Sequence, residues 1–262
     1  MTTHALGSAC RAVSQFWDTV VEEFLADGRI PESVEPWASS YQGKGKGVVD
    51  RDALPELFLG PLTKPRAVFL ALNPGKPDPR FHHRGGIFVH EIREKGSYSA
   101  WAASWPYLRD PWVSKNGRNS HHRRRLRFLR DWIDNPELPC SAMVSFELYP
   151  WHSHGITAPI GGGAAREFIQ EHVWEPVKEL GVPIFAFGAP WFSILKRIPE
   201  LKVVRCLGNG GIGYGSSAKT RSVIVLQGGG LTVIAEKHSG SAGPPSRDET
   251  MRLREALDDF CR

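Results

Sequence analysis

Apolar residues recur along the chain with two periods, and segments of the two kinds alternate. From Cys10 to Asp27 the apolar side chains follow helical spacing and Gly28 ends the run, which predicts a helix. Further helical patterns cover residues 120–134, about 164–180, a short stretch after Pro190, and 247–260. Apolar runs of strand length lie at residues 67–72, 142–146, 183–187 and 231–235, with shorter runs at 201–204 and 222–226. This alternation predicts an α/β fold.

Segments rich in Pro and Gly separate these elements and predict loops. Residues 31–64 predict a long loop over the surface, and residues 77–88 predict a loop that walls a pocket, because they carry too much Pro and Gly for a helix. Glycine-rich loops are expected at 208–215 and 228–230. Most aromatic residues between 96 and 112 are expected in the core.

Four of the predicted strands end in polar turns. The turns are Asn73-Pro74-Gly75, Glu147-Leu148-Tyr149-Pro150, Gly188-Ala189-Pro190 and His238-Ser239-Gly240-Ser241. Parallel strands joined by helices deliver their carboxyl ends to one edge of a sheet, where α/β proteins place ligand sites. If the four strands are parallel, the four turns form one pocket.

Basic residues concentrate in the segment that begins at Lys115. The formal net charge of the chain is only +5, yet no acidic residue occurs from Lys115 until Asp131. The segment 120–134 therefore predicts an amphipathic helix with an arginine-rich side, and the alternative is an ordinary solvated face. The side chains expected to contact phosphates are Lys76, Arg123, Arg124, Arg125 and Arg127.

Composition argues against several classes of protein. The four cysteines form no CxxC pair, so neither a zinc site nor an iron–sulfur cluster is expected. His152 and His154 have no third ligand at a recognisable spacing, so no metal is expected. Because no segment approaches 18 consecutive apolar residues and no signal peptide begins the chain, a cytoplasmic protein without a membrane partner is expected. Nothing requires more than a monomer.

The motifs and their order resemble the uracil-DNA glycosylase superfamily over roughly residues 65–245. Leu72-Asn73-Pro74-Gly75 is similar to the first motif of the mismatch-specific branch, in which the asparagine positions the hydrolytic water. His238-Ser239-Gly240-Ser241 is similar to a degenerate second motif, which lies beside the scissile bond and contacts DNA. Phe146 to Pro150 occupies the position of the strand end that reads the base.

The resemblance implies a fold and an activity. The implied fold is a single domain of residues 1–262, a three-layer α/β/α arrangement around a central, mostly parallel four-stranded sheet. Residues 1–64 would extend its core of 65–245, and 246–262 would form the last helix. The implied activity is a monofunctional DNA N-glycosylase without a cofactor, acting on single- or double-stranded DNA. Asn73 and His238 would be catalytic; the base-binding residues would be Glu147, Phe88, Phe81, Tyr149, Pro74 and Gly75.

Two departures from the family pattern bear on the substrate. Glu147 replaces the asparagine that pairs with uracil, and an ionised carboxylate only accepts hydrogen bonds, which favours the amine of a cytosine-type base over uracil. Since excising ordinary cytosine would destroy the host genome, a modified cytosine in foreign DNA, and hence antiviral defence, is expected. The alternative for Glu147 is an ion pair with an arginine. The wedge leucine of the second motif is missing, with Ala242 and Gly243 nearby, so the strand preference stays open.

Three other functions remain as alternatives. One is a repair glycosylase for uracil or another deaminated base. The second is a nucleic-acid-binding module that kept the fold without the chemistry. The third is a hydrolase of free nucleosides or nucleotides, which would not need the arginine cluster.

Overall fold

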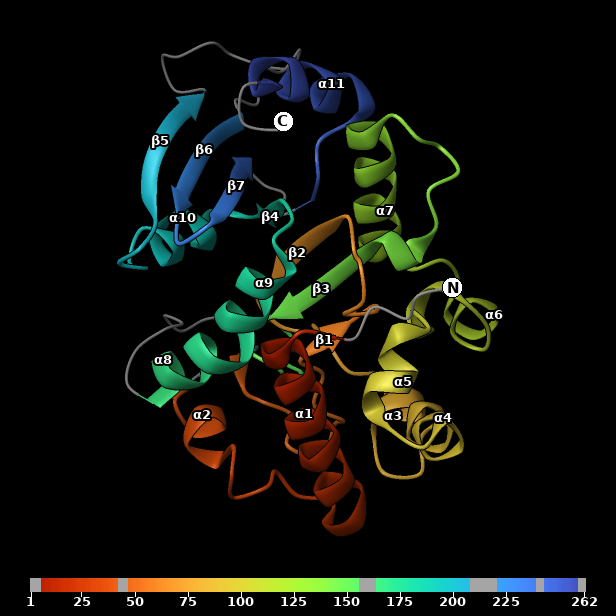
Figure 1. Cartoon of the computed structure of the whole chain (residues 1–262). Helices are drawn as coiled ribbons and strands as arrows, with labels where there is room; N and C mark the ends of the chain where they lie inside the picture. The colour runs from red at the N-terminus through yellow and green to blue at the C-terminus, as the bar shows by residue number, and fades with distance from the viewer. Residues whose placement is uncertain (1–5, 42–46, 156–163, 208–220, 239–242, 259–262) are drawn as a thin grey trace. The chain divides into compact units, whose positions relative to one another are not determined.

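The chain is an α/β protein, and its computed structural model describes residues 6–41, 47–155, 164–207, 221–238 and 243–258 (Figure 1). Seven strands form a mixed sheet in the order β1-β3-β2-β4-β7-β6-β5. The residues group into two compact units, described separately below. Unit 1 comprises Met1–Lys64, Ala71–Pro106 and Val144–Leu180, and unit 2 comprises Pro65–Leu70, Tyr107–Met143 and Gly181–Arg262. Among the described residues, none of the helices is both long and apolar enough to cross a membrane.

Unit 1 contains most of the helices of the first half of the chain. Its elements are α1 (Ser8–Asp27), α2 (Glu35–Ser39), β1 (Phe58–Leu59), α3 (Pro79–His82), α4 (Ile87–Lys95), α5 (Tyr98–Ala103), most of β3 (Met143–Glu147), α8 (Ala164–Ile169), a π-helical turn (Gln170–Trp174) and α9 (Glu175–Leu180). The predicted helices at 10–27 and 164–180 are therefore confirmed. Strand β1 pairs with β3 in antiparallel register, with Phe58 opposite Phe146.

Helix α1 shows how sequence pattern and packing agree. Its apolar stripe is buried, and Gly28 adopts the left-handed conformation that lets its N–H reach the carbonyl of Phe24. At the other end the Glu179 carboxylate accepts hydrogen bonds from the backbone N–H groups of Ala9 and Cys10 at 2.8 and 2.9 Å. A side chain from α9 thus satisfies the unpaired donors of the first turn of α1.

Two loop predictions in unit 1 are wrong. Residues 31–64 do not form a loop over the surface: they include α2 and β1, and residues 53–60 are all buried. Residues 77–88 are partly helical, because the Asp78 carboxylate caps α3 by accepting from the Arg80 N–H, and Pro79 occupies the first turn, where it costs no hydrogen bond. Gly86 then precedes α4. The Pro and Gly residues mark helix ends rather than a continuous loop.

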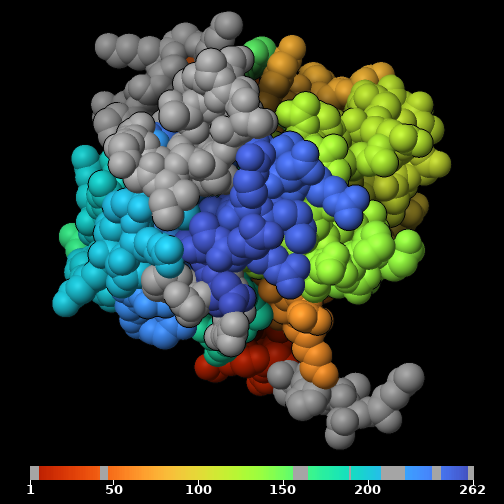
Figure 2. Space-filling view, turned by 90° about the horizontal axis from the view of Figure 1, so that it is seen from above, coloured from red at the N-terminus to blue at the C-terminus, as the bar shows by residue number. Residues whose placement is uncertain are grey.

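Unit 2 contains the larger part of the sheet. Its elements are most of β2 (Ala67–Ala71), α6 (Trp112–Asn116), α7 (Ser120–Ile133), the short 3-10 helix Cys140–Ala142, β4 (Ile184–Phe187), α10 (Ala189–Leu195), β5 (Lys202–Leu207), β6 (Arg221–Gly228), β7 (Leu231–His238) and α11 (Arg247–Ala256). Helix α11 (blue) lies against α7 (light green) in Figure 2. Between these two helices, the Nε of Arg247 lies 3.7 Å from the Oδ1 of Asp131.

The pairing of the unit 2 strands confirms part of the expected topology. Strand β2 is parallel to β4 and β4 is parallel to β7, so three of the four strands with polar turns run in one direction. Strands β5 and β6 add antiparallel pairs, and β6 joins β7 through a tight hairpin. The expectation of four strands is wrong, because the sheet has seven. Gly228–Gly230 form that hairpin turn instead of a long loop, and Gly229 and Gly230 have positive φ.

Candidate active site

The turn after β2 places Asn73 at the end of a fully buried strand. Gly75 has φ +87°, a conformation that favours glycine and closes the turn. The Nδ2 of Asn73 lies 2.8 Å from the Oγ of Ser153, whose hydroxyl donates to the carbonyl of Gly155 at 3.0 Å. Since a serine hydroxyl has one proton, it must accept from Asn73, which fixes the orientation of the amide. The Oδ1 of Asn73 therefore points away from Ser153 and can accept a hydrogen bond.

Two backbone contacts in unit 1 hold the end of β3 beside this turn. The Leu148 N–H donates to the carbonyl of Ala71 at 2.9 Å, and the Ser153 N–H donates to the carbonyl of Gly75 at 3.1 Å. Glu147, between β3 and this loop, has a side chain that is only 4% exposed. The structure thus brings together the first motif, with Asn73, Pro74 and Gly75, and the strand end that carries Glu147.

Three predicted base-binding aromatic residues are part of the core of unit 1. Phe81 and Phe88 are 0% exposed and their ring centroids are 5.0 Å apart, so no face of either ring is open for stacking on a base. Tyr149 is also buried, and its hydroxyl donates to the carbonyl of Ala38. Burial raises the pKa of Tyr149. These expectations are corrected: the three side chains pack in the interior of unit 1 instead of lining a surface.

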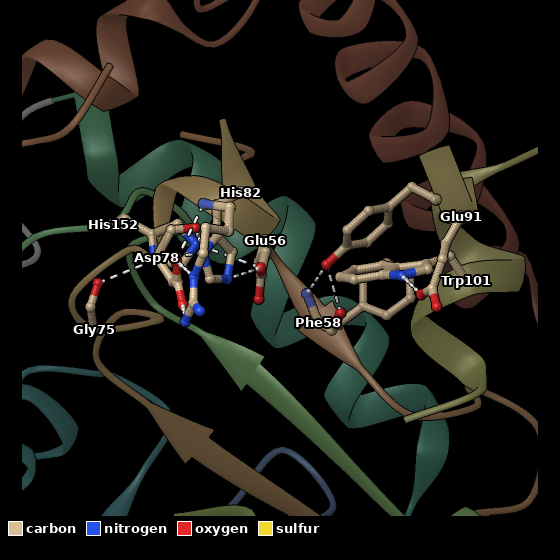
Figure 3. A network of polar contacts seen from close by, with 10 residues as sticks. Glu56, Phe58, Gly75, Asp78, His82, Glu91, Trp101 and His152 are labelled. Atoms are coloured by element: carbon tan, nitrogen blue, oxygen red, sulfur yellow. Dashed lines mark hydrogen bonds and ion pairs between the residues drawn. The ribbon is translucent and has the colours of Figure 1, made fainter. Parts of the chain in front are cut away.

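A buried cluster of Glu56, His82 and His152 lies next to the Asn73 turn in unit 1 (Figure 3). Each side chain is about 1% exposed. The Nε2 atoms of His82 and His152 lie 3.6 and 3.3 Å from Oε1 of Glu56. The Nδ1 of His152 lies 3.0 Å from the carbonyl of Gly75, so the cluster contacts the turn directly. Burial, and then the neighbouring His152, lower the pKa of His82 to about 4 despite the opposing effect of Glu56.

The arginine-rich helix α7 in unit 2 is confirmed, with one correction. Arg123, Arg124 and Arg127 are exposed. They line a hollow of about 370 Å³ with Arg118, Ser120, Leu126 and Arg130. Arg125 is not on this surface: it is 3% exposed, and its guanidinium lies 5.9 Å from the ring centroid of Phe69. Arg125 lies on the side of α7 that faces strand β2, which contains Phe69.

The remaining predicted residues lie outside the described site. Lys76 is exposed in the turn of unit 1. His238 ends β7, but the structure describes only its backbone. Ser239, Gly240 and Ser241 lie outside the described residues, as does the glycine-rich segment 208–215.

Sequence reasoning missed Glu56, His82 and Ser153. Glu56 and His82 belong to segments predicted to be loops, and no spacing links them to His152. Ser153 follows His152 in a stretch that was considered only for its histidines. The one available signal was the run of apolar residues around Glu56, which indicates that this carboxylate is drawn into the core.

Comparisons with known proteins found no relatives. No protein-family model matches the chain. No curated protein and no solved structure matches it at a significant level. The resemblance to the uracil-DNA glycosylase superfamily therefore depends on the motifs, their order and their strand contexts.

Proposed function

We propose that this protein is a monofunctional DNA N-glycosylase. The observation that carries the proposal is the Asn73 amide, fixed by Ser153 at the carboxyl end of a buried strand, with its carbonyl oxygen directed away from that contact. An amide held in this way can accept a hydrogen bond from one water molecule and orient it. Glycosidic hydrolysis needs such a positioned water.

The chemistry divides between the water and the leaving base. The N-glycosidic bond breaks with positive charge developing on the sugar and negative charge on the departing base. Asn73 cannot act as a strong base, so its contribution is orientation of the water that attacks the sugar carbon. His238, in the degenerate second motif, is proposed to donate a hydrogen bond to the leaving base, and Ser239, Gly240 and Ser241 to contact the DNA backbone.

Glu147 is the proposed reader of the base. Its carboxylate, near the end of a strand tied to the Asn73 turn, accepts hydrogen bonds and would pair with the exocyclic amine of a cytosine-type base. The proposed substrate is accordingly a modified cytosine in foreign DNA, and the proposed role is defence. A base must leave the stack to reach a buried carboxylate, so base flipping is part of the proposal.

The exposed arginines of α7 support a nucleic-acid partner. Arg123, Arg124 and Arg127 line one hollow on the surface of unit 2, and α7 has no acidic residue in its first turn. Such a surface suits phosphate groups and binds them in a salt-dependent manner. The parallel strands β2, β4 and β7 support the proposed three-layer glycosylase-like fold.

An abasic-site assay tests the proposal. Purified protein is incubated with single- or double-stranded DNA that contains uracil, cytosine or a hypermodified cytosine, and abasic sites are then cleaved with alkali. Cleavage only of DNA with modified cytosine is expected. Cleavage of uracil DNA would instead identify a repair glycosylase and contradict the role of Glu147. Retention of DNA without any cleavage would favour a binding module.

A further inference from the structure

The three side chains of the buried cluster come from three segments of unit 1. Glu56 precedes β1, His82 ends α3, and His152 lies in the loop after β3. One ligand-type atom from each residue lies within 4.8 Å of the other two. The two Nε2 atoms lie 3.6 and 3.3 Å from the same Glu56 oxygen, longer than a good hydrogen bond in both cases.

These spacings match those of ligands around a small metal ion. With metal–ligand bonds of about 2.0–2.2 Å, two tetrahedral ligands lie about 3.4 Å apart. The two distances from the Glu56 oxygen to the Nε2 atoms thus match the separation that a shared ion would impose, and the ligand atoms of all three residues lie within 4.8 Å of one another. Two imidazoles and one carboxylate are also a common three-ligand set for Zn²⁺.

The ring nitrogens opposite the cluster face backbone groups. The Nδ1 of His152 lies 3.0 Å from the carbonyl of Gly75, an acceptor, which is the second contact expected of a histidine that binds a metal through Nε2. The Nδ1 of His82 lies 2.9 Å from the carbonyl of Asp78. It also accepts a hydrogen bond from the N–H of Asp78 at 2.8 Å. For Nε2 of His82 to bind a metal, Nδ1 has to carry the proton and donate to the carbonyl, so the N–H contact is given up.

Charge balance also favours a cation in the cluster. A carboxylate that is about 1% exposed loses the solvation that water gives it, and two neutral imidazoles add no compensating charge. A divalent cation held by all three side chains would supply such charge. We propose that Glu56, His82 and His152 bind a divalent transition-metal ion, best matched by Zn²⁺, which joins three segments of unit 1.

The proposed ion has a structural consequence that does not depend on the glycosylase assignment. It would fix the ring of His152, whose Nδ1–H donates to Gly75, and so would hold the turn that contains Asn73. Because the three ligands are almost fully buried, the ion is proposed to hold these segments together, with a small ligand such as water in its fourth position.

The test measures metal in the full chain, purified without a metal-chelating tag. Elemental analysis after extensive dialysis is expected to find about one zinc per chain. Cobalt added to metal-free protein is expected to give the intense visible absorption of four-coordinate Co²⁺. Zinc added back is expected to raise the unfolding midpoint by about 5 °C or more. These measurements use the unmodified chain and therefore do not require any variant to fold.

Substitutions then assign the ligands. Glu56→Gln and His152→Gln are expected to lose the zinc and the rise in unfolding midpoint on adding zinc. His154→Gln, at an exposed position two residues away, is the matched control and keeps both. The proposal is overturned if metal-free protein neither binds zinc nor changes its unfolding midpoint, which would leave the three side chains as a hydrogen-bonded cluster. Zinc binding that survives both substitutions would also overturn it.

Discussion

The amide nitrogen of Asn73 donates a 2.8 Å hydrogen bond to the hydroxyl of Ser153, and this contact joins the turn after β2 to the loop after β3. The hydroxyl already donates its one hydrogen bond to the carbonyl of Gly155, so towards Asn73 it can only accept. The side-chain amide of Asn73 could be rotated by 180°, which would exchange its nitrogen and oxygen. The contact with Ser153 selects one of these two orientations. The first prediction follows from it.

Asn73→Ala is expected to remove glycosylase activity, with a loss of about 100-fold or more in kcat, because the water loses the group that orients it. Ser153→Ala is expected to cost about 10-fold, because the amide remains but can rotate. Single-turnover base excision measures both. Ser193→Ala, whose hydroxyl bonds its own helix in unit 2, is the control. Equal activity of Asn73→Ala and the unmodified protein would remove Asn73 from the mechanism.

The exposed arginines of α7 give a prediction about salt. Replacing Arg123 and Arg124 by Gln removes two cations, so the slope of log K against log salt is expected to become shallower by about 1.8. Fluorescence anisotropy with a labelled DNA at several salt concentrations measures this slope. Arg29→Gln replaces another exposed arginine, in unit 1, and is expected to leave the slope unchanged. An unchanged slope in the double variant would place the DNA elsewhere.

Arg125 is expected to behave differently from its neighbours. Because its side chain is buried over Phe69, Arg125→Ala removes packing, and the free energy of unfolding should fall by about 1–3 kcal/mol. Urea unfolding measures the loss. The salt slope of DNA binding should stay unchanged in protein that is folded. A shallower salt slope of DNA binding in Arg125→Ala, with an unchanged free energy of unfolding, would show that Arg125 contacts phosphate.

His122 predicts a dependence of stability on pH. Burial, and then the nearby His121 and Arg125, hold its pKa well below the ordinary 6.5. Below pH 6.5 the unfolded chain therefore binds a proton that the folded chain does not, and stability falls as the pH falls, by about 1.4 kcal/mol per pH unit. In His122→Gln this part of the decline between pH 6.5 and 5 should disappear. Chemical unfolding of both proteins at several pH values compares the slopes, and parallel slopes would contradict the assignment.

Substitutions of Phe88 distinguish a role in packing the core from a role in stacking on a base. The ring is 0% exposed and lies 5.0 Å from that of Trp101, so Phe88→Ala should cost about 3–5 kcal/mol of stability. Phe88→Leu keeps most of the apolar volume and should retain excision activity. A folded Phe88→Leu protein that no longer binds the flipped base would restore the stacking role that the sequence suggested.

Much of the fold was predictable because local patterns and tertiary burial agree. The run from Ala67 to Leu72 contains β2, and the stripe on residues 120–134 gives α7 with nearly the predicted bounds. The errors occur where single residues act as helix caps, as Asp78 does before α3. On composition alone, Pro79 indicates a loop. In the first turn of a helix, however, a proline is favourable.

The candidate site was predictable only in part, for a different reason. Asn73 and Glu147 follow strands, so their neighbourhood can be inferred from the direction of the chain. Glu56 and His82 meet His152, and Ser153 meets Asn73, through tertiary packing of segments with no fixed spacing. Arg125 shows the same limit: within a run of arginines, only the packing of the helix decides which one faces the sheet.

Strand β5 ends the order of the sheet and carries two exposed valines, Val203 and Val204, which are 41% and 46% exposed. Such an edge is a template on which a second chain could continue the ladder and start aggregation. Its register with β6 shifts between Val203 and Arg205, and Lys202 and Arg205 place positive charges on either side. An irregular edge with flanking charges opposes the addition of a strand from another molecule, so this short stretch protects the sheet against edge-to-edge association.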